Sequence, residues 1–180
     1  MGSSDGILIN LILIVYLINI LKYVNYDIVF QELPNETTLA INISNCPCHC
    51  KGCHSSYLAE DIGNFLDLCT LMRLIDKNEG ITCVAFMGGD SDPQSVNMLA
   101  GIVQTKGLLT AWYSGRQELS KDVDIKNFNF IKLGPYVEEL GGLKSPTTNQ
   151  RMYEVKMCRE LDEDGNPIYG LEDITSSFWK

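Results

Sequence analysis

Four of the seven cysteines lie within one stretch of eight residues, at Cys46, Cys48, Cys50 and Cys53. A disulfide framework normally spreads its cysteines along the chain, because a bridge stabilises a fold by closing a long loop. Clustered thiols are more typical of metal ligands in a reducing compartment. The other three cysteines lie in apolar or mixed stretches, where a free cysteine behaves as a small hydrophobic side chain. The cluster therefore predicts a metal-binding loop.

Several ligand sets are compatible with this loop. Cys46, Cys50 and Cys53 give the spacing C-x3-C-x2-C, and their thiolates suit both iron and zinc, which accept soft sulfur donors. A structural zinc ion needs four ligands and would have to recruit Cys48, His54 or a distant group. A redox pair of Cys50 and Cys53 is a third interpretation, but it leaves Cys46 without a role. Three thiolates are also what a four-iron cluster needs if one iron is to keep an open position.

The composition is that of one folded domain. Of 180 residues, 45% are hydrophobic and 21% are charged, close to the average for globular proteins. A chain of this length buries roughly 70% of the surface that its unfolded form exposes. Its 14 basic and 23 acidic residues give a net charge of -9, which repels phosphate backbones and favours a partner with a basic docking face. We therefore expect no nucleic-acid partner.

Short apolar runs alternate with longer mixed segments, the pattern of strands joined by helices. Strands are expected at residues 27–30, 38–43, 81–87, 108–113 and 128–133, with helices within 56–77 and over 93–106. Asp92 and Pro93 form the N-cap and first-turn pair of the second helix. Asp164-Gly165, between the apolar runs 153–161 and 168–171, predicts a terminal hairpin. The sequence thus predicts an α/β domain over residues 22–180.

Residues 7–21 form an apolar stretch, ILINLILIVYLINIL. As a helix it would span only about 22 Å, against a hydrocarbon core of about 30 Å. It also lacks the basic start and small-residue cleavage site of a signal peptide. We therefore expect residues 1–21 to be an extension outside the functional domain, with a membrane-associating segment as the alternative.

A second motif, Gly88-Gly89-Asp90, follows the apolar run 81–87 directly. Such a run predicts a strand that is buried on both faces of a parallel sheet. Glycines at a strand end let the backbone come close to a ligand, and the carboxyl ends of strands are where barrel enzymes place their chemistry. By itself, however, Gly-Gly after a strand is more often a simple turn.

Together the two motifs resemble the radical S-adenosylmethionine family, which has C-x3-C-x2-C after its first barrel strand and Gly-Gly-Glu or Gly-Gly-Asp at a later strand end. The resemblance implies an incomplete (β/α) barrel in which Cys46, Cys50 and Cys53 bind three irons of a 4Fe-4S cluster. It also implies that S-adenosylmethionine chelates the fourth iron and that Gly88, Gly89 and Asp90 contact its ammonium group. Many members have an aromatic residue at the position of Gly52, so we expect His54 to supply the packing surface instead.

The chain from Lys22 onward is similar to the activating proteins of anaerobic ribonucleoside-triphosphate reductases. The matching segments are Trp112-Tyr113-Ser114-Gly115, Gly134-Pro135-Tyr136-Val137-Glu138-Glu139-Leu140 and Thr147-Thr148-Asn149-Gln150-Arg151. This likeness implies that Ser114 lies at the edge of the cofactor. It implies an oxidoreductase that cleaves S-adenosylmethionine reductively and removes a hydrogen from a glycine of the reductase large subunit.

The same likeness implies a cytoplasmic protein, not a membrane one, with a one-electron donor such as flavodoxin and an open side of the barrel for its large partner. Two alternatives stay open. One is an activase of another glycyl-radical enzyme, and the other is a zinc-stabilised binding module.

Overall fold

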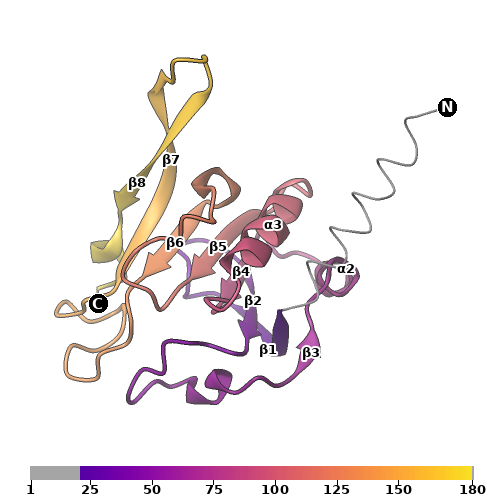
Figure 1. Cartoon of the computed structure of the whole chain (residues 1–180), viewed down its shortest axis with the longest axis vertical. Coiled ribbons are helices and arrows are strands. Elements are labelled where there is room, and N and C mark those ends of the chain that lie inside the picture. The colour runs from indigo at the N-terminus through magenta and orange to yellow at the C-terminus, as the bar shows by residue number, and fades with distance from the viewer. Residues whose placement is uncertain (1–20, 180) are drawn as a thin grey trace.

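The computed structural model describes residues 21–179, and its centre is an eight-stranded sheet (Figure 1). The strands run in the order β3-β1-β2-β4-β5-β6-β7-β8. Their bounds are β1 Lys22–Val29, β2 Thr38–Ile43, β3 Asn64–Phe65, β4 Cys83–Met87, β5 Leu109–Tyr113, β6 Phe130–Leu133, β7 Arg151–Leu161 and β8 Pro167–Asp173. The α-helices are α2 Leu68–Lys77 and α3 Pro93–Gln104, and the short 3-10 helices are η1 Ser56–Ala59, η2 Ile125–Asn127 and η3 Thr175–Phe178.

The sheet is mixed and open. Strands β2, β4, β5 and β6 are parallel neighbours at its centre. The outer strands are antiparallel, with β1 beside β2 and with β7 beside both β6 and β8. The predicted α/β class is therefore confirmed. The expected barrel of parallel strands corresponds here to four parallel strands within a sheet that does not close.

The helices begin where their capping residues stand. Asp92 accepts a hydrogen bond from Ser95 N at 3.2 Å, and Pro93 opens α3 as predicted. Asp67 accepts one from Thr70 N at 2.7 Å and so fixes the start of α2 at Leu68. The helix expected within 56–77 therefore occupies only the second part of that range, because η1 and β3 take up the first part.

Side chains of the central strands alternate between two faces. Val84, Phe86 and Trp112 are fully buried in the main core, where they pack with the apolar faces of α2 and α3. Ala85 and Ala111 belong to a smaller cluster on the opposite face. Their small side chains leave space over that face, which neither α-helix covers.

The N-terminal extension lies outside the described residues up to position 20. Leu21, its last residue, is buried in the main core and its carbonyl accepts a hydrogen bond from Leu66 N at 2.9 Å. Across residues 21–179, no helix has the length and apolar character needed to cross a membrane.

The predicted terminal hairpin is confirmed as β7 and β8. Its turn contains Asp164 and Gly165, and Gly165 has a φ of 81°, a conformation that glycine adopts readily. Strand β7 begins at Arg151, two residues earlier than expected. Figure 1 shows the hairpin extending well beyond the rest of the sheet.

Candidate functional site

The candidate site lies at the carboxyl ends of the four parallel strands. The register places Asn42 of β2 beside Met87 of β4, Met87 beside Tyr113 of β5, and Tyr113 beside Lys132 of β6. Strand β2 leads toward the cysteine loop, β4 into residues 88–90, β5 into Ser114 and β6 into residues 134–140. The topology thus gathers at one edge motifs that are distant in the sequence.

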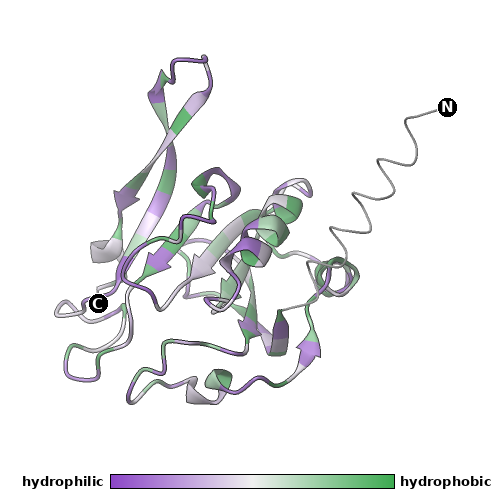
Figure 2. Cartoon of the chain, in the orientation of Figure 1, coloured by the Kyte–Doolittle hydropathy of each residue, from purple (hydrophilic) through white to green (hydrophobic). Residues whose placement is uncertain are grey.

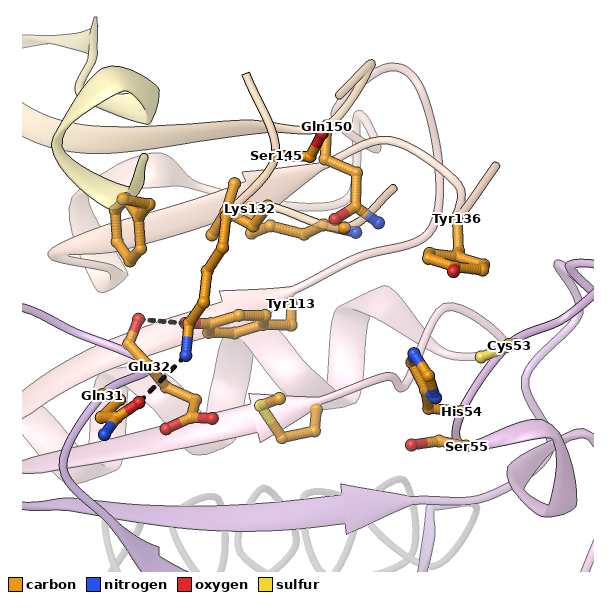
Figure 3. A pocket seen from close by; sticks show the side chains of 15 residues that line it. Gln31, Glu32, Cys53, His54, Ser55, Tyr113, Lys132, Tyr136, Ser145 and Gln150 are labelled. Carbon is orange, nitrogen blue, oxygen red and sulfur yellow. Dashed lines mark hydrogen bonds between the residues drawn. The ribbon is translucent and has the colours of Figure 1, made fainter. Parts of the chain in front are cut away.

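All four cysteines of the loop line one cavity of about 180 Å³, together with Asp90, Ser114 and the ends of β4 to β6. A larger cavity of about 710 Å³ shares several of these lining residues, among them Cys53, Tyr113 and Lys132. Figure 3 shows Lys132, Gln150 and Tyr136 along one wall of the larger cavity and His54 on the wall opposite. This space adjoins the cysteine loop on the sheet face that α2 and α3 leave open.

Asp90 is the polar centre of the site, with only 1% of its surface exposed. Ser114 Oγ donates to Asp90 Oδ1 at 2.5 Å, and Gly115 N donates to Oδ2 at 2.9 Å. Arg116 adds an ion pair at 3.9 Å between its Nε and Oδ1. The structure therefore joins two predicted site residues, Asp90 and Ser114, in one network that fastens the end of β4 to the end of β5.

Gly88 and Gly89 are required by the packing of the chain itself. Their φ angles are 98° and 86°, in the region that side-chain-bearing residues rarely adopt. A Cβ on Gly88 would lie 2.9 Å from Ile43 O, and one on Gly89 would lie 2.5 Å from Val96 Cγ2. These contacts are with β2 and α3. Gly88 also lines the cysteine-lined cavity, and the approach of a ligand to these two glycines stays a prediction.

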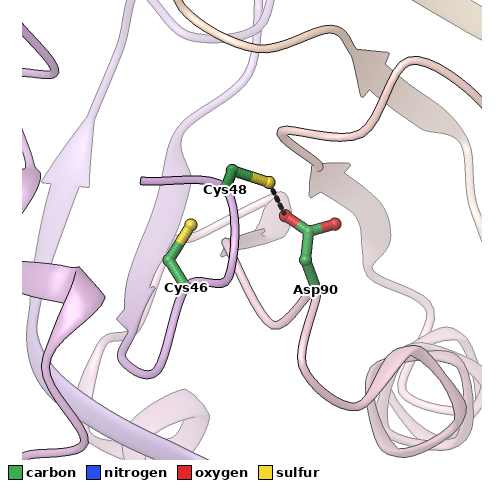
Figure 4. Close-up of side chains that lie close together, drawn as sticks. All are labelled: Cys46, Cys48 and Asp90. Atoms are coloured by element: carbon green, nitrogen blue, oxygen red, sulfur yellow. Dashed lines mark hydrogen bonds between the residues drawn. The ribbon is translucent and has the colours of Figure 1, made fainter. Parts of the chain in front are cut away.

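The cysteine loop brings its thiols together unevenly. Ligand atoms of Cys46, Cys48 and Asp90 all lie within 4.8 Å of one another, and Figure 4 shows the Cys48 thiol directed at the carboxylate. The Cys48 Sγ lies 3.9 Å from Asp90 Oδ2. Burial, and then the negative charges of Asp90 and Cys46, raise the pKa of the Cys48 thiol to about 12. Cys50 and Cys53 lie further along the loop, where Cys53 N donates to Cys50 O at 3.3 Å.

The loop over residues 134–141 packs onto the cysteine loop. The rings of His54 and Tyr136 are 5.7 Å apart and tilted by 54°, within the usual range for an aromatic contact. Gly52 has a φ of 72°, and a Cβ there would lie 3.1 Å from Glu138 Cδ. His54 thus contacts Tyr136, while glycine at position 52 leaves room for Glu138.

Lys132 is a site residue that the sequence argument missed. Its side chain is buried, and Nζ donates to Ser114 O at 3.3 Å and to Gly134 O at 2.6 Å. Burial lowers the pKa of this ammonium group to about 8, although Asp90 and the nearby cysteines oppose the decrease. A lysine inside the apolar run FIKL was the available signal, because a charged residue within a central strand is rarely incidental.

Comparisons with protein-family models, with curated proteins and with solved structures found no match. Inferences about chemistry therefore depend on the site itself. It offers four thiols, a buried carboxylate and a buried ammonium group around two adjoining cavities. Thiols in this number are ligands for iron or zinc, and the larger cavity has the volume of a small-molecule site.

Proposed function

We propose that this chain is a radical S-adenosylmethionine enzyme that activates a glycyl-radical enzyme, with the large subunit of an anaerobic ribonucleoside-triphosphate reductase as partner. One observation carries the proposal. All four cysteines line a single cavity with Gly88, Asp90 and Ser114, at the carboxyl ends of parallel strands. The sequence resemblance concerned separate motifs, and their meeting in one place is what an enzyme of this type requires.

The donor set fits a 4Fe-4S cluster held by Cys46, Cys50 and Cys53. The three cysteines come from one loop and are half-buried, free thiols, and the adjoining cavity of about 710 Å³ leaves space beside them for a cofactor. When bound, the cluster and S-adenosylmethionine supply one-electron reductive cleavage and hydrogen-atom abstraction. The open sheet would then be the family's incomplete barrel.

The residues of the chain itself would orient the cofactor and shield it from water. The bonds from Ser114 and Gly115 hold Asp90 in one position, where its carboxylate can attract the ammonium group of the cofactor. Tyr113, Tyr136 and His54 line the larger cavity, where their rings would shield a bound cofactor from water. The uncovered face leaves an entry for a glycine-bearing segment, and holding that segment close is the main requirement of such a step. A cytoplasmic location and a flavodoxin-like electron donor belong to the same proposal.

Anaerobic reconstitution of cysteine variants tests the ligand set. Cys46→Ala should lose most of the bound iron and acid-labile sulfide, because it removes one of the three spaced thiolates. Cys48→Ala is the matched control on the same loop and should keep most of both. Cys69→Ala, at an exposed thiol on α2, controls for the loss of any cysteine. Iron retained by Cys46→Ala and lost by Cys48→Ala would show that the ligand set is wrong.

The reaction is tested by electron paramagnetic resonance. The loaded chain, S-adenosylmethionine, a one-electron reductant and the reductase should give a glycyl-radical doublet. Replacing the target glycine of the reductase by alanine should remove the doublet while cofactor cleavage continues. A doublet on a different glycyl-radical enzyme, and none on the reductase, would keep the activase chemistry and reject the named partner.

The contact among Cys46, Cys48 and Asp90 favours one other candidate, a zinc-stabilised binding module. Their ligand atoms are close enough to share a single ion, and such a site would complete its tetrahedron with one further ligand. Zinc at one equivalent, without iron or sulfide, would support this candidate. Cys48→Ala would then release the metal, whereas Cys53→Ala would not.

A further inference from the structure

The β7–β8 hairpin projects from the sheet without a strand neighbour along most of its length. Strand β7 pairs with β6 only through residues 151–154. Beyond Glu154, within residues 21–179, β7 and β8 pair only with each other. A two-stranded ribbon of this kind is marginally stable alone. A partner that covered its exposed side chains would stabilise it, which indicates a function in binding.

One face of this hairpin is apolar. Val155 lies opposite Leu171, and Met157 lies opposite Tyr169, so the four side chains share a face. Met157 is 66% exposed. Leu161 lies beyond an irregularity in the register, but it pairs with Pro167, which shares a face of β8 with Tyr169, and it is 61% exposed. Figure 2 shows hydrophobic residues recurring on the hairpin between hydrophilic ones. Because Val155 packs against the main core, this face lies on the helix side of the sheet, opposite the cysteine-lined cavity.

A cleft of about 580 Å³ separates the hairpin from η2 on that side. Ile125, Pro167 and Tyr169 provide its apolar lining, and Asp124 and Asp162 lie at its polar positions. Lys126 also lines the cleft, but its Nζ lies 2.7 Å from Asp124 Oδ2, so its charge is paired within the chain. The same ion pair offsets the charge of Asp124, so the cleft offers apolar surface beside one further carboxylate, that of Asp162.

The charge of the hairpin determines what kind of partner fits it. Residues 151–173 contain seven acidic and three basic residues, a net charge of -4 within the -9 of the whole chain. A second copy would bring the same acidic surface against it, and like charges across an interface are unfavourable. Residues 1–20 carry only one charged side chain, Asp5, and offer no complementary charge. A protein surface with apolar side chains surrounded by lysine and arginine is complementary in both respects.

We propose that the apolar face of the β7–β8 hairpin, with the cleft beside η2, is the docking surface for the partner enzyme. This rests on the proposed function for the partner's identity. The partner contributes an apolar anchor to the cleft and basic residues to the acidic hairpin. Docking on this face leaves the cavity on the opposite face open to the glycine-bearing segment.

The test compares two full-length variants with the wild-type chain in anaerobic equilibrium binding to the reductase. Met157→Ser with Leu161→Ser removes two exposed apolar side chains of the docking face. Ile168→Ser is the control, because Ile168 is 39% exposed on the same hairpin and alternation places it on the other face. The double variant should bind at least about ten-fold more weakly, as expected for interface anchors, and Ile168→Ser should bind as the wild type does.

Two further measurements accompany the binding curves. Affinity of the wild type should fall as ionic strength rises from about 0.01 M to about 0.15 M, because screening weakens attraction between exposed charges. Cleavage of S-adenosylmethionine without the partner should be equal in all three proteins, because the substitutions lie away from the cysteine loop.

Unchanged affinity in the double variant would overturn the docking surface. A changed oligomeric state of the double variant alone would also overturn it, since a second copy would then be the occupant. A wild-type chain that cleaves the cofactor but does not bind the reductase overturns this proposal and leaves the cofactor chemistry standing. Binding through the hairpin by a chain that assembles no cluster supports the docking surface and rejects the proposed function.

Discussion

Replacing Lys132 by methionine should change how the stability of the metal-free chain depends on pH. Lys132 is buried, and its ammonium group is bonded to two carbonyl oxygens. No carboxylate of residues 21–179 lies within ion-pair distance of it, since the ion pairs there involve other lysines and arginines. Methionine has a similar length and no charge, so it removes the titration while filling much of the same space.

The direction of this pH dependence follows from whether the folded and unfolded states hold the Lys132 proton. Burial lowers the Lys132 pKa from 10.5 to about 8 in the folded chain. Below pH 8 the lysine is protonated in both states, and the folded state bears the whole penalty of a buried charge. Between pH 8 and 10.5 the folded state releases the proton while the unfolded state keeps it, so stability increases with pH. At about 1.4 kcal/mol per pKa unit, the change is about 3 kcal/mol.

Urea denaturation of wild type and Lys132→Met, measured on reduced protein from pH 7 to pH 10.5, gives this difference directly. The free energy of unfolding of the wild type, relative to the variant, should rise by about 3 kcal/mol over the range. Titration of groups that do not interact with Lys132 cancels in the comparison, whereas Asp90 and the loop cysteines interact with its charge and contribute to the measured difference. Lys144→Met, at an exposed lysine on the rim of the larger cavity, removes a lysine without altering a buried position. A difference that stays flat with pH would show that Lys132 is hydrated or paired.

Three other substitutions test the packing around the site. Gly89→Ala should lower the free energy of unfolding by about 3 kcal/mol, since it combines a left-handed φ with a Cβ 2.5 Å from a side chain of α3. Gly107→Ala, with a φ of 73° and open space, should lose only about 1 kcal/mol, and equal losses would refute the contact. Gly115→Ala places a Cβ 2.6 Å from Cys48 Sγ and should lower the free energy of unfolding by about 1–3 kcal/mol. Adding Cys48→Ala should recover most of that loss. A double-mutant cycle without coupling would refute the contact. Asp90→Asn should cost about 1–3 kcal/mol, because an amide has one acceptor oxygen where the carboxylate has two. It should also weaken binding of S-adenosylmethionine to the loaded chain, because it removes the charge that attracts the ammonium group. Unchanged affinity would remove Asp90 from the cofactor site.

Local signals predicted those elements whose boundaries are set locally. The strand expected at 38–43 matches β2 at both ends, and Asp92 with Pro93 begins α3 as expected. Strand β1 starts five residues before the predicted position 27, because residues 22–26 (KYVNY) mix polar, aromatic and apolar side chains and form no continuous apolar run. Strand direction could not be predicted, since it depends on pairing partners. The apolar runs contain no information that β1 and β7 would be antiparallel to the central strands.

The site was predicted as separate motifs, and its connections were not. Asp90 and Ser114 were each expected near the cofactor, but their hydrogen bond depends on the register of β4 against β5. The position of Lys132 depends in turn on the register of β5 against β6. Register is fixed by which residues face the core along whole strands, so a motif of three residues does not reveal it.

The surroundings of Cys48 in the fold bear on the choice between ligand sets with and without this residue, which the spacing of the cysteines leaves open. Its thiol lies against the backbone of Gly115 and 3.9 Å from the buried carboxylate of Asp90. A metal ligand must be a thiolate, and a thiolate here would stand beside a second negative charge in a poorly solvated place. The raised pKa of Cys48, about 12, expresses that penalty. In the metal-free chain Cys48 is therefore a neutral thiol beside the buried carboxylate. A bound cation would offset the charge of Asp90 and favour the thiolate, so the iron and zinc content of Cys48→Ala and Cys53→Ala decides between the two ligand sets.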